Sequence, residues 1–439
     1  MPSRLGYNSK LHLLLYRKSD IIKQMLDVKF VKENREIVEK ALAKKAYNFD
    51  LDHLFRIDEE RLRLIRVVDE LRQRRNEAAK NRDIEAGQEI KMQLEKEEMA
   101  LSAVEEQFRA ELFKIPNLPL EGVPEGDETH NQVIKKEGEP KQFDFEPADH
   151  VALGAAKDII DIPRGAKVSG SRFAFLKGDG VLLELALVHY AMDRLMKEGF
   201  TPIVPPALIK QEITQGLGYW QGGGNENYYY VQDHDEEDQG KDLNLYLIGT
   251  GEHSVAPMHS GEIFEEKELP KRYVAFSPCY RREAGSYGKD THGILRVHQF
   301  DKVEMVSFVK PEDDAAERSK ILALAESLVR QLELPYQTVR LASGDLSFPA
   351  AETIDIETWI PSQGKYRETH SISTTTDFQA RRLGIKYRVG GETKFVHILN
   401  GTALAIGRII IAILENYQTK DGSIEVPKVL REYLGKDSL

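Results

Sequence analysis

The sequence has a single cysteine, Cys279, among its 439 residues, so an internal disulfide is excluded. A chain without disulfides is typical of a reducing compartment and favours a cytoplasmic protein. One cysteine and scattered histidines also provide no cluster of zinc ligands. No uninterrupted apolar run of about eighteen residues occurs, so we expect no membrane-spanning helix and no membrane partner.

Glycine and proline are nearly absent from one long stretch of the N-terminal part. Between Val31 and Ile115 the only glycine is Gly87 and there is no proline, whereas Glu, Lys, Arg, Leu and Ala are abundant, which favours helix. Apolar residues at steps of three and four indicate heptads on two helices. The two seams are formed by Ile57, Leu64, Val68, Leu71 and Ala78, and by Ile90, Leu94, Leu101, Val104 and Phe108.

The simplest structure for this stretch is a long antiparallel helical hairpin that reverses direction at Gly87. Its tip is basic and carries Arg72, Arg74, Arg75, Lys80 and Arg82. A protruding basic tip can contact phosphates without reading a base sequence. A coiled-coil spacer or dimerisation element with solvated charges would have the same composition, so both interpretations stay open. The net charge of −11 does not decide between them, because local patches steer a charged partner.

Residues 1–24 fit the rest of the chain poorly. The apolar run Leu11–Tyr16 is conceivable as part of a targeting signal, but it is short and no small-residue cleavage site follows. A flexible extension is therefore expected there. We predict three parts: an extension at 1–24, a helical arm at 25–118, and a catalytic α+β domain at 119–439 that follows a proline-rich linker.

The second half of the chain mixes strands and helices without strict alternation. The β-rich runs are Tyr228–Val231, Leu243–Ile248 and Tyr273–Phe276, and the helical segments are Leu182–Glu198, Glu312–Leu332 and Ala405–Tyr417. This mixture favours an α+β fold, an antiparallel sheet flanked by helices. There is no Walker-type phosphate loop, so an ATP site would have to be built another way.

The most informative segment is Cys279–Glu304, which reads as two strands joined by a glycine-punctuated loop. Residues two apart share a strand face, so Arg281 and Glu283 should point the same way. The second strand would present Arg296, His298, Phe300, Lys302 and Glu304 on one face. Burying these charges against apolar layers would be costly, so we interpret the face as the floor of a site for phosphate, a purine ring and an amine. An exposed hairpin with cross-strand ion pairs is the alternative.

Two further segments carry weaker signals. Arg408 lies in a nearly all-apolar helical segment, where it must reach a partner or a cavity unless it snorkels at the helix margin. Thr250 and Glu252 are two apart and would share a strand face. A hydroxyl beside a carboxylate suits a small zwitterion, although by itself the pair more often has a structural role.

Taken together, these segments resemble the motifs of the class II aminoacyl-tRNA synthetases. Motif 1 is similar to Glu198–Leu208, with Pro206 at the motif's proline, motif 2 to Cys279–Glu304, and motif 3 to His397–Gln418. The sequences of Arg296–Glu304 and of Tyr366–Arg382 resemble those of the seryl-tRNA synthetase family. The resemblance extends from Met25 to about Tyr433, the arm included.

The resemblance implies an ATP-dependent, AMP-forming serine–tRNA ligase. Such an enzyme would convert serine and ATP into seryl-adenylate and pyrophosphate, and then transfer serine to the terminal adenosine of tRNA(Ser). Charging of selenocysteine tRNA stays open. The resemblance also implies a class II antiparallel sheet, Mg²⁺ as cofactor, a homodimer with Pro206 at its interface, and an arm that contacts the tRNA backbone through its basic tip.

Roles for individual residues follow from the same resemblance. Arg281 would bind the ATP α-phosphate, Arg296 the γ-phosphate, Glu283 the adenine amino group, Phe300 the adenine face, and the backbone of Val297 the nucleotide, while Arg408 would cap the adenine and reach the γ-phosphate. Glu368 and Ser371 would hold Mg²⁺, and Thr250, Glu252, Arg281, Glu304 and Thr402 would contact serine. Catalysis would come from charge neutralisation by Arg281, Arg296 and Arg408.

Among the departures from the family's usual residues, two bear on the contacts to the amino acid. Thr402 replaces a serine and Thr374 replaces an asparagine, which bears on the amino-acid pocket and leaves the ATP assignments unchanged. Two rival functions remain. A ligase that loads an amino acid onto a carrier protein would not need the basic hairpin, and an inactive regulatory paralogue would be expected to lose Arg281, Glu283 or Arg408.

Overall fold

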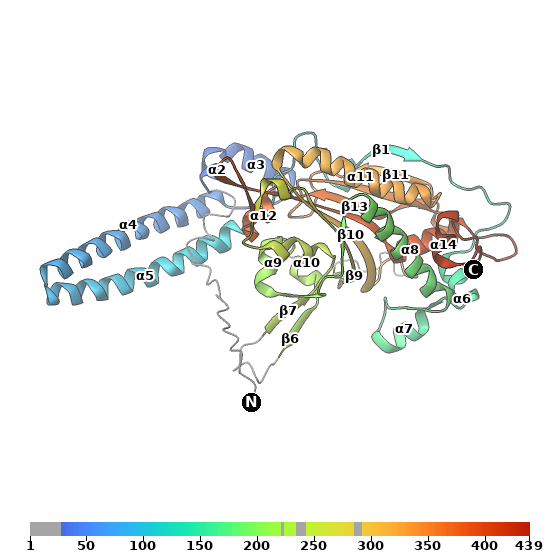
Figure 1. The fold of residues 1–439 in the computed structure, drawn as a ribbon, viewed down its shortest axis with the longest axis horizontal. Coiled ribbons are helices and arrows are strands. Elements are labelled where there is room, and N and C mark those ends of the chain that lie inside the picture. Colours follow the sequence, from blue (N-terminus) through green and yellow to red (C-terminus); the bar gives the residue numbers. More distant parts are fainter. Residues whose placement is uncertain (1–27, 221–223, 234–242, 285–291) are drawn as a thin grey trace, which may run out of the picture.

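The structure, a computed structural model, describes residues 28–220, 224–233, 243–284 and 292–439. The expected extension at residues 1–24 lies outside these ranges. In Figure 1 a long helical hairpin projects from a body in which helices cover a large sheet. None of the helices in the described ranges is both long and apolar enough to cross a membrane.

The hairpin confirms the predicted arm. It consists of α4 (Leu51–Asn81) and α5 (Ile84–Leu112), and two short helices, α2 (Val28–Glu33) and α3 (Arg35–Lys44), pack at its base. With 31 residues, α4 is about 45 Å long. The predicted seams face each other: Val68 and Leu71 pack with Ile90 and Leu94 in a narrow apolar cluster.

The reversal between the two helices is not at Gly87, so that prediction is wrong. Helix α4 ends at Asn81, and Arg82 takes the left-handed conformation with φ 57°. The side chain of Asp83 then accepts a hydrogen bond from the amide of Ala86 at 3.1 Å and caps α5. Gly87 lies inside the first turn of α5. The cap, which satisfies an otherwise unpaired amide, placed the turn at Arg82 and Asp83 instead of at the glycine.

The body is built on one large sheet. Its eight strands lie in the order β1 (Gln132–Glu137), β11 (Tyr336–Arg340), β12 (Glu352–Ile360), β13 (Lys365–Thr374), β16 (His397–Ala405), β10 (Gln299–Val309), β9 (Lys271–Tyr280) and β4 (Thr201–Ile203). All neighbours are antiparallel except β4 and β9, which are parallel. The predicted antiparallel α+β fold is confirmed.

Three helices cover one face of this sheet, namely α8 (Asp179–Lys197), α11 (Asp314–Gln331) and α13 (Ile406–Asn416). Val303 and Met305 of β10 belong to the apolar core beneath them. The alternation of the strand sends Phe300, Lys302 and Glu304 to the opposite face. A catalytic site can therefore occupy that face without exposing the main core.

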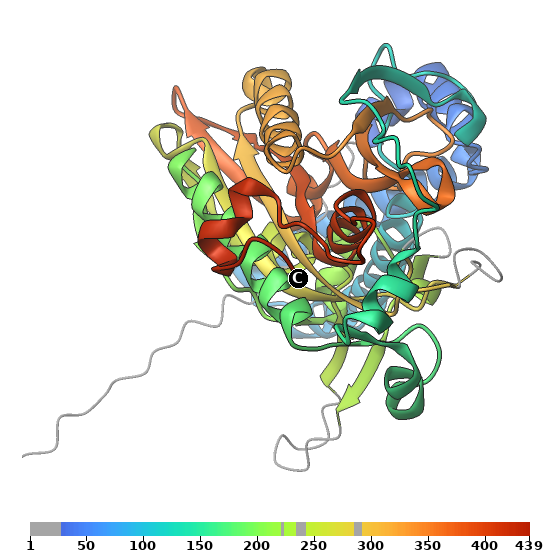
Figure 2. The ribbon, with the colours of Figure 1, turned by 90° about the vertical axis from the view of Figure 1, so that its right-hand side faces the viewer.

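The remaining elements surround the body, which Figure 2 shows from the end opposite the arm tip, with the C-terminal residues nearest the reader. The helices are α6 (His150–Ala156), α7 (Ile162–Ser169), α9 (Gln211–Leu217), α10 (Glu252–Val255), α12 (Phe378–Leu383) and α14 (Arg431–Leu434). The small sheets are β5 (Leu208–Lys210) with β7 (Leu243–Leu247) and β6 (Tyr230–Asp233), β15 (Glu392–Phe395) with β14 (Lys386–Val389) and β8 (Ile263–Glu265), and β2 (Ile160–Asp161) with β3 (Phe175–Leu176).

Candidate active site

A cavity of about 570 Å³ lies over the charged face of β10. This volume is in the range of sites that bind small molecules. All the residues predicted to contact ATP, Mg²⁺ or serine line it: Thr250, Glu252, Arg281, Glu283, Arg296, Val297, Phe300, Glu304, Glu368, Ser371, Thr402 and Arg408. Segments that are up to about 160 residues apart in the chain thus meet at one place.

The two strands of the motif 2 segment are shorter than predicted. Strand β9 ends at Tyr280 and β10 begins at Gln299, so Arg281, Glu283 and Arg296 lie in the connection and not on strands. The last cross-strand contact is the amide of Arg281 donating to the carbonyl of His298 at 2.9 Å. Beyond it the amide of Arg282 donates to the carbonyl of Asn227 at 2.8 Å, which pulls the chain out of the sheet. The strand prediction failed because a distant segment took over these backbone contacts.

Arg281 and Arg296 enter the cavity from the two ends of this connection. Arg281 Nε donates to the carbonyl of Gly249 at 3.1 Å, and its guanidinium lies 5.5 Å from the ring centre of Phe300. Arg296 Nη1 forms an ion pair of 2.5 Å with Glu283 Oε2. A fixed cation beside an aromatic face is suited to a nucleotide.

Arg408 finds the partner that its apolar helix required. Its Nη1 donates to the carbonyl of Glu368 at 2.8 Å and lies 3.1 Å from Glu368 Oε1, while Nε donates to the carbonyl of Leu295 at 3.3 Å. Partial burial would raise the pKa of Glu368, but Arg408 and Arg281 outweigh it and hold the pKa below its usual range. Glu368 therefore presents a charged oxygen to the cavity at neutral pH.

The floor of the cavity carries a buried ion pair. Lys302 Nζ lies 2.5 Å from Glu304 Oε2, and the hydroxyl of Thr402 donates to the same oxygen at 3.3 Å. Glu304 and Thr402 are cross-strand partners on β10 and β16. All three residues are less than 9% exposed. Lys302 was predicted to lie on this face, but sequence reasoning assigned it no role.

Glu252 is held from two sides at the other wall. Strand β7 ends at Leu247 and Glu252 begins α10, so the predicted strand for Thr250 and Glu252 is wrong, although both residues line the cavity. Gln379 Nε2 donates to Glu252 Oε1 at 2.8 Å and the hydroxyl of Tyr219 donates to Oε2 at 2.9 Å. Burial raises the pKa of Glu252 to about 7, and the nearby charge of Glu304 contributes. A cationic ligand would restore the charge on this carboxyl.

The donors available for a divalent metal are oxygen atoms. Glu368 and Ser371 line the cavity beside Asp355. Asp355 Oδ1 is buried and has no hydrogen-bond partner among the described residues, and burial together with Glu368 holds the pKa of Asp355 well above its usual range. No group of three or more His, Cys, Asp or Glu side chains in the described ranges could hold a metal alone. These residues fit Mg²⁺, which keeps phosphate and water ligands.

Several residues of the cavity had no signal in the sequence that marked them as site residues. Tyr219 and Tyr228 come from a segment outside the motifs, and Asn400 lies within motif 3 but was assigned no role. Asn400 Nδ2 is buried and without a partner in the described part of the chain, which is typical of a functional site. Thr374, which was expected to affect the amino-acid pocket, does not line the cavity. Its hydroxyl donates to Asp314 Oδ2 at 2.7 Å, on the other face of β13.

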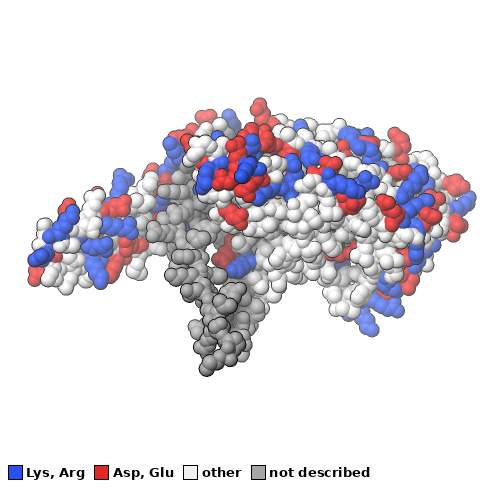
Figure 3. All heavy atoms as spheres, in the orientation of Figure 1, with Lys and Arg blue, Asp and Glu red and all other residues white. Residues whose placement is uncertain are grey.

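The predicted tRNA-binding residues lie at the far end of the arm, where Figure 3 shows basic side chains on the surface. Arg72, Arg74, Arg75, Lys80 and Arg82 are all exposed. Arg72 pairs with Glu98 at 2.8 Å across the hairpin. Pro206 is exposed beyond the edge strand β4, and its carbonyl accepts a hydrogen bond from Ser254 Oγ at 2.6 Å.

Two family models match the chain. The model of the seryl-tRNA synthetase N-terminal domain matches residues 25–119, and the model of the tRNA synthetase class II core domain (G, H, P, S and T) matches residues 229–417. The serine–tRNA ligase of Thermodesulfovibrio yellowstonii is 43% identical over 94% of this chain and 99% of its own.

Solved structures are similar over the same length. The seryl-tRNA synthetase of Pyrococcus horikoshii, complexed with ATP, has a TM-score of 0.84 and 37% identity, and the match covers 94% of this chain and 99% of that one. The cytoplasmic serine–tRNA ligase of Naegleria fowleri, in complex with AMP, has a TM-score of 0.82 and 31% identity, with 94% and 98% of the two chains covered.

Proposed function

This chain belongs to the seryl-tRNA synthetase family, and we propose that its central cavity binds ATP and serine side by side. The protein is a serine–tRNA ligase, which activates serine with ATP and transfers it to tRNA. The observation that carries the proposed site is the convergence of Arg281, Arg408 and Glu252 on one cavity.

The nucleotide is proposed to occupy the end with the arginines. Arg281 would meet the α-phosphate, and Phe300 and Arg408 would enclose the adenine ring. Arg296 and Glu283 form an ion pair with each other. ATP would separate them, because the γ-phosphate attracts Arg296 while the adenine amino group donates to Glu283. Mg²⁺ held by Glu368 and Ser371, with Asp355 nearby, would neutralise phosphate charge.

Serine is proposed to occupy the end formed by Glu252 and Glu304. Glu252 and the hydroxyl of Thr250 suit the ammonium group, and Glu304 with Thr402 suits the serine hydroxyl. Lys302 keeps these two carboxylates from facing each other without a counter-charge. Alanine would be rejected because it would leave the buried Glu304 without a hydrogen-bond donor from the substrate.

In the first step the serine carboxylate attacks the α-phosphorus in line, and pyrophosphate leaves. Negative charge accumulates around the α-phosphate, where the preplaced Arg281 stabilises it. In the second step a ribose hydroxyl of the terminal tRNA adenosine attacks the acyl carbon and AMP leaves. The chain contributes positioning and charge neutralisation, and neither step requires a protein group as general base.

The remaining parts of the proposal concern the assembly. Residues 25–118 would form the tRNA-binding arm and 119–439 the catalytic domain, with tRNA(Ser) held by its backbone at the arm tip. A homodimer would form along β4 and Pro206, and this is supported by the exposed apolar side chains of Val204, which follows β4, and of Leu185 and Val181 on α8, the helix that contacts β4. A cytoplasmic location is supported by the single cysteine, which cannot form an internal disulfide.

Serine-dependent exchange between ATP and pyrophosphate tests the activation site, with threonine, alanine and glycine as controls. We expect exchange with serine and little with the others. Exchange with none of them would contradict the proposal, and preference for threonine would show that the pocket differs from the one described. Charging of tRNA(Ser) in the same preparation separates this enzyme from a carrier-protein ligase, which would exchange but not charge tRNA.

A further inference from the structure

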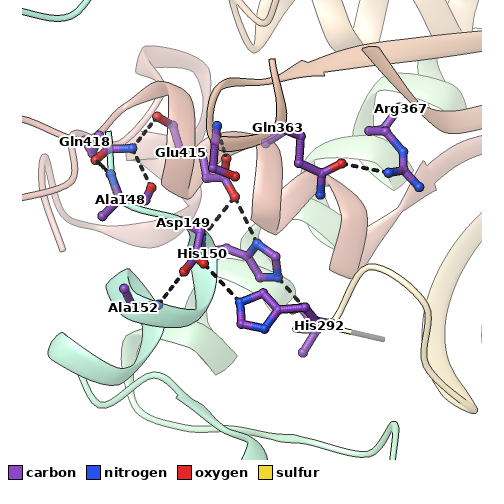
Figure 4. A network of polar contacts seen from close by, with 12 residues as sticks. Ala148, Asp149, His150, Ala152, His292, Gln363, Arg367, Glu415 and Gln418 are labelled. Atoms are coloured by element: carbon purple, nitrogen blue, oxygen red, sulfur yellow. Dashed lines mark hydrogen bonds and ion pairs between the residues drawn. The ribbon is translucent and has the colours of Figure 1, made fainter. Parts of the chain in front are cut away.

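A buried polar network connects α6, α13 and the segment that returns from the motif 2 connection to β10. We call residues 292–298 the return segment. Figure 4 shows His150, the first residue of α6, directed at Glu415 of α13. His150 Nδ1 lies 2.9 Å from Glu415 Oε1, and both side chains are buried. The amides of His150 and Ser362 also donate to the Glu415 carboxylate, each at 3.0 Å, so both of its oxygens accept hydrogen bonds from N–H donors.

The second ring nitrogen of His150 identifies its tautomer. The amide of Ile294 donates to His150 Nε2 at 3.3 Å, so Nε2 is an acceptor and carries no proton. The proton is therefore on Nδ1, which donates to Glu415. His150 is a neutral bridge between a carboxylate on α13 and a backbone amide of the return segment.

Helix α13 holds the return segment at two consecutive residues. Glu415 acts through His150 on the amide of Ile294, and Arg408 Nε donates directly to the carbonyl of Leu295 at 3.3 Å. Ile294 and Leu295 line the cavity, and the next two residues are Arg296 and Val297. The residues with proposed ATP contacts therefore follow directly after two anchored peptide groups, whereas His150 itself does not line the cavity.

Gly293 shows how closely the return segment lies against the histidine. It has φ +79°, and a Cβ atom there would lie 1.9 Å from His150 Nε2. Any side chain at this position would displace either the ring or the segment. The adjacent His292, by contrast, has a side chain that is 70% exposed and contacts Asp149 Oδ2 at 3.0 Å near the surface.

We propose that His150, oriented by Glu415, is a positioning residue for the nucleotide, because it fixes the backbone from which Arg296 and Val297 reach ATP. The inference rests on the proposed function of the cavity. It makes α13 responsible for two features of the nucleotide site, a direct cation in Arg408 and a backbone anchor in His150. Serine binding, which uses β10, β16 and α10, does not depend on this anchor.

The test measures KM for ATP and for serine separately by pyrophosphate exchange, with ATP affinity measured directly by calorimetry. For His150→Ala we expect KM for ATP to rise about tenfold, the loss typical of one buried hydrogen bond. KM for serine should stay within about twofold. His150→Gln, whose amide oxygen can accept from Ile294, should recover most of the loss. Gly293→Ala should also raise KM for ATP, since its Cβ atom would push the return segment and the His150 ring apart at the same contact.

His292→Ala is the matched control, because it removes a neighbouring imidazole that pairs with Asp149 and packs edge-on against the His150 ring at 6.4 Å between ring centres, while the contact between His150 and the amide of Ile294 is kept. Both constants should remain within about twofold of the wild-type values. Circular dichroism establishes that each variant is folded. An unchanged KM for ATP in folded His150→Ala, or an equal rise in both constants, would overturn the inference. If His150→Ala does not fold, the same two measurements on Gly293→Ala test the inference: an unchanged KM for ATP, or an equal rise in both constants, would overturn it. Absence of exchange in the wild-type protein would instead refute the proposed function, and the inference with it.

Discussion

The arm tip and the cavity are both rich in arginine and lysine, but these cations differ in their exposure and in their partners. At the tip Arg74, Arg75 and Lys80 are exposed, and within the described residues none of them has an ion-pair partner. In the cavity Arg281 and Arg408 are bound to backbone carbonyls, and Arg408 also to a carboxylate. Hydrated, mobile cations suit a long phosphate backbone, whereas fixed and partly desolvated ones suit one geometry.

The contrast also separates local from non-local construction. The tip is made by one stretch of sequence, and its helices need only a heptad seam and two caps. The cavity needs residues from β10, β13, β16, α10 and α13 at once. We therefore expect substitutions at the tip to weaken tRNA charging gradually and to leave serine activation unchanged. Substitutions in the cavity should reduce activation strongly, and the loss should depend on the exact position of the substituted side chain.

The largest effect should come from Arg281→Gln. Removing the fixed cation should lower kcat for exchange by about 1,000-fold, because charge that develops at the α-phosphate loses its stabilising partner. The adjacent Arg282→Gln is the control, since Arg282 is exposed and does not line the cavity. Equal losses of kcat in both variants would mean that catalysis depends on the overall positive charge and not on the fixed position of Arg281. The contrast between the cavity and the arm tip would then be wrong.

A smaller effect is expected when Arg74, Arg75 and Lys80 are replaced together by alanine. The value of kcat/KM for tRNA should fall about ten- to hundredfold, and its dependence on salt concentration should become weaker. Pyrophosphate exchange, which needs no tRNA, should be unchanged. Alanine substitution of three exposed lysines of the body, Lys267, Lys365 and Lys394, controls for net charge. A parallel loss of exchange would contradict the assignment of the tip to tRNA.

The pH dependence of serine binding tests the electrostatics of the cavity more finely. Glu252 has a pKa of about 7, raised by burial, so it is mostly ionised at pH 8 and mostly protonated at pH 6. Since only the carboxylate pairs with the serine ammonium group, KM for serine should rise about tenfold from pH 8 to pH 6. Glu252→Gln should bind serine weakly and lose this dependence. A KM that is flat with pH in the wild-type protein would contradict the role of Glu252.

The smallest effect concerns the arm. Gly87 lies inside α5 and a Cβ atom there would meet nothing within 4 Å, so Gly87→Ala should stabilise the hairpin by about 0.5–1 kcal/mol. Hydrogen exchange of the α5 amides measures the change, which should appear as slower exchange. Val68→Ala, which removes a buried methyl pair from the seam, should have the opposite sign. Faster exchange in Gly87→Ala would indicate that the chain reverses direction at Gly87 and not at Arg82 and Asp83.

Particular residues show what could be predicted. The seams of the hairpin and the apolar helix around Arg408 were recognisable because periodicity and composition act over a few turns. Periodicity and composition did not predict correctly where the hairpin reverses direction, and the two strands predicted for motif 2 were longer than β9 and β10. In each case a specific partner decided the backbone: Asp83 capped α5, and Asn227 took the amide of Arg282.

The sequence by itself determined the arm, the antiparallel α+β class and, through its motifs, the family. Those properties depend on short-range pattern and on motifs that are contiguous in the chain. Only the tertiary structure decided that Lys302 neutralises Glu304, that Thr374 faces away from the cavity and that His150 holds Ile294. Hydrogen bonds and charge pairs between distant segments depend on angstrom-scale distances, and such distances exist only after the sheet and its helices have packed.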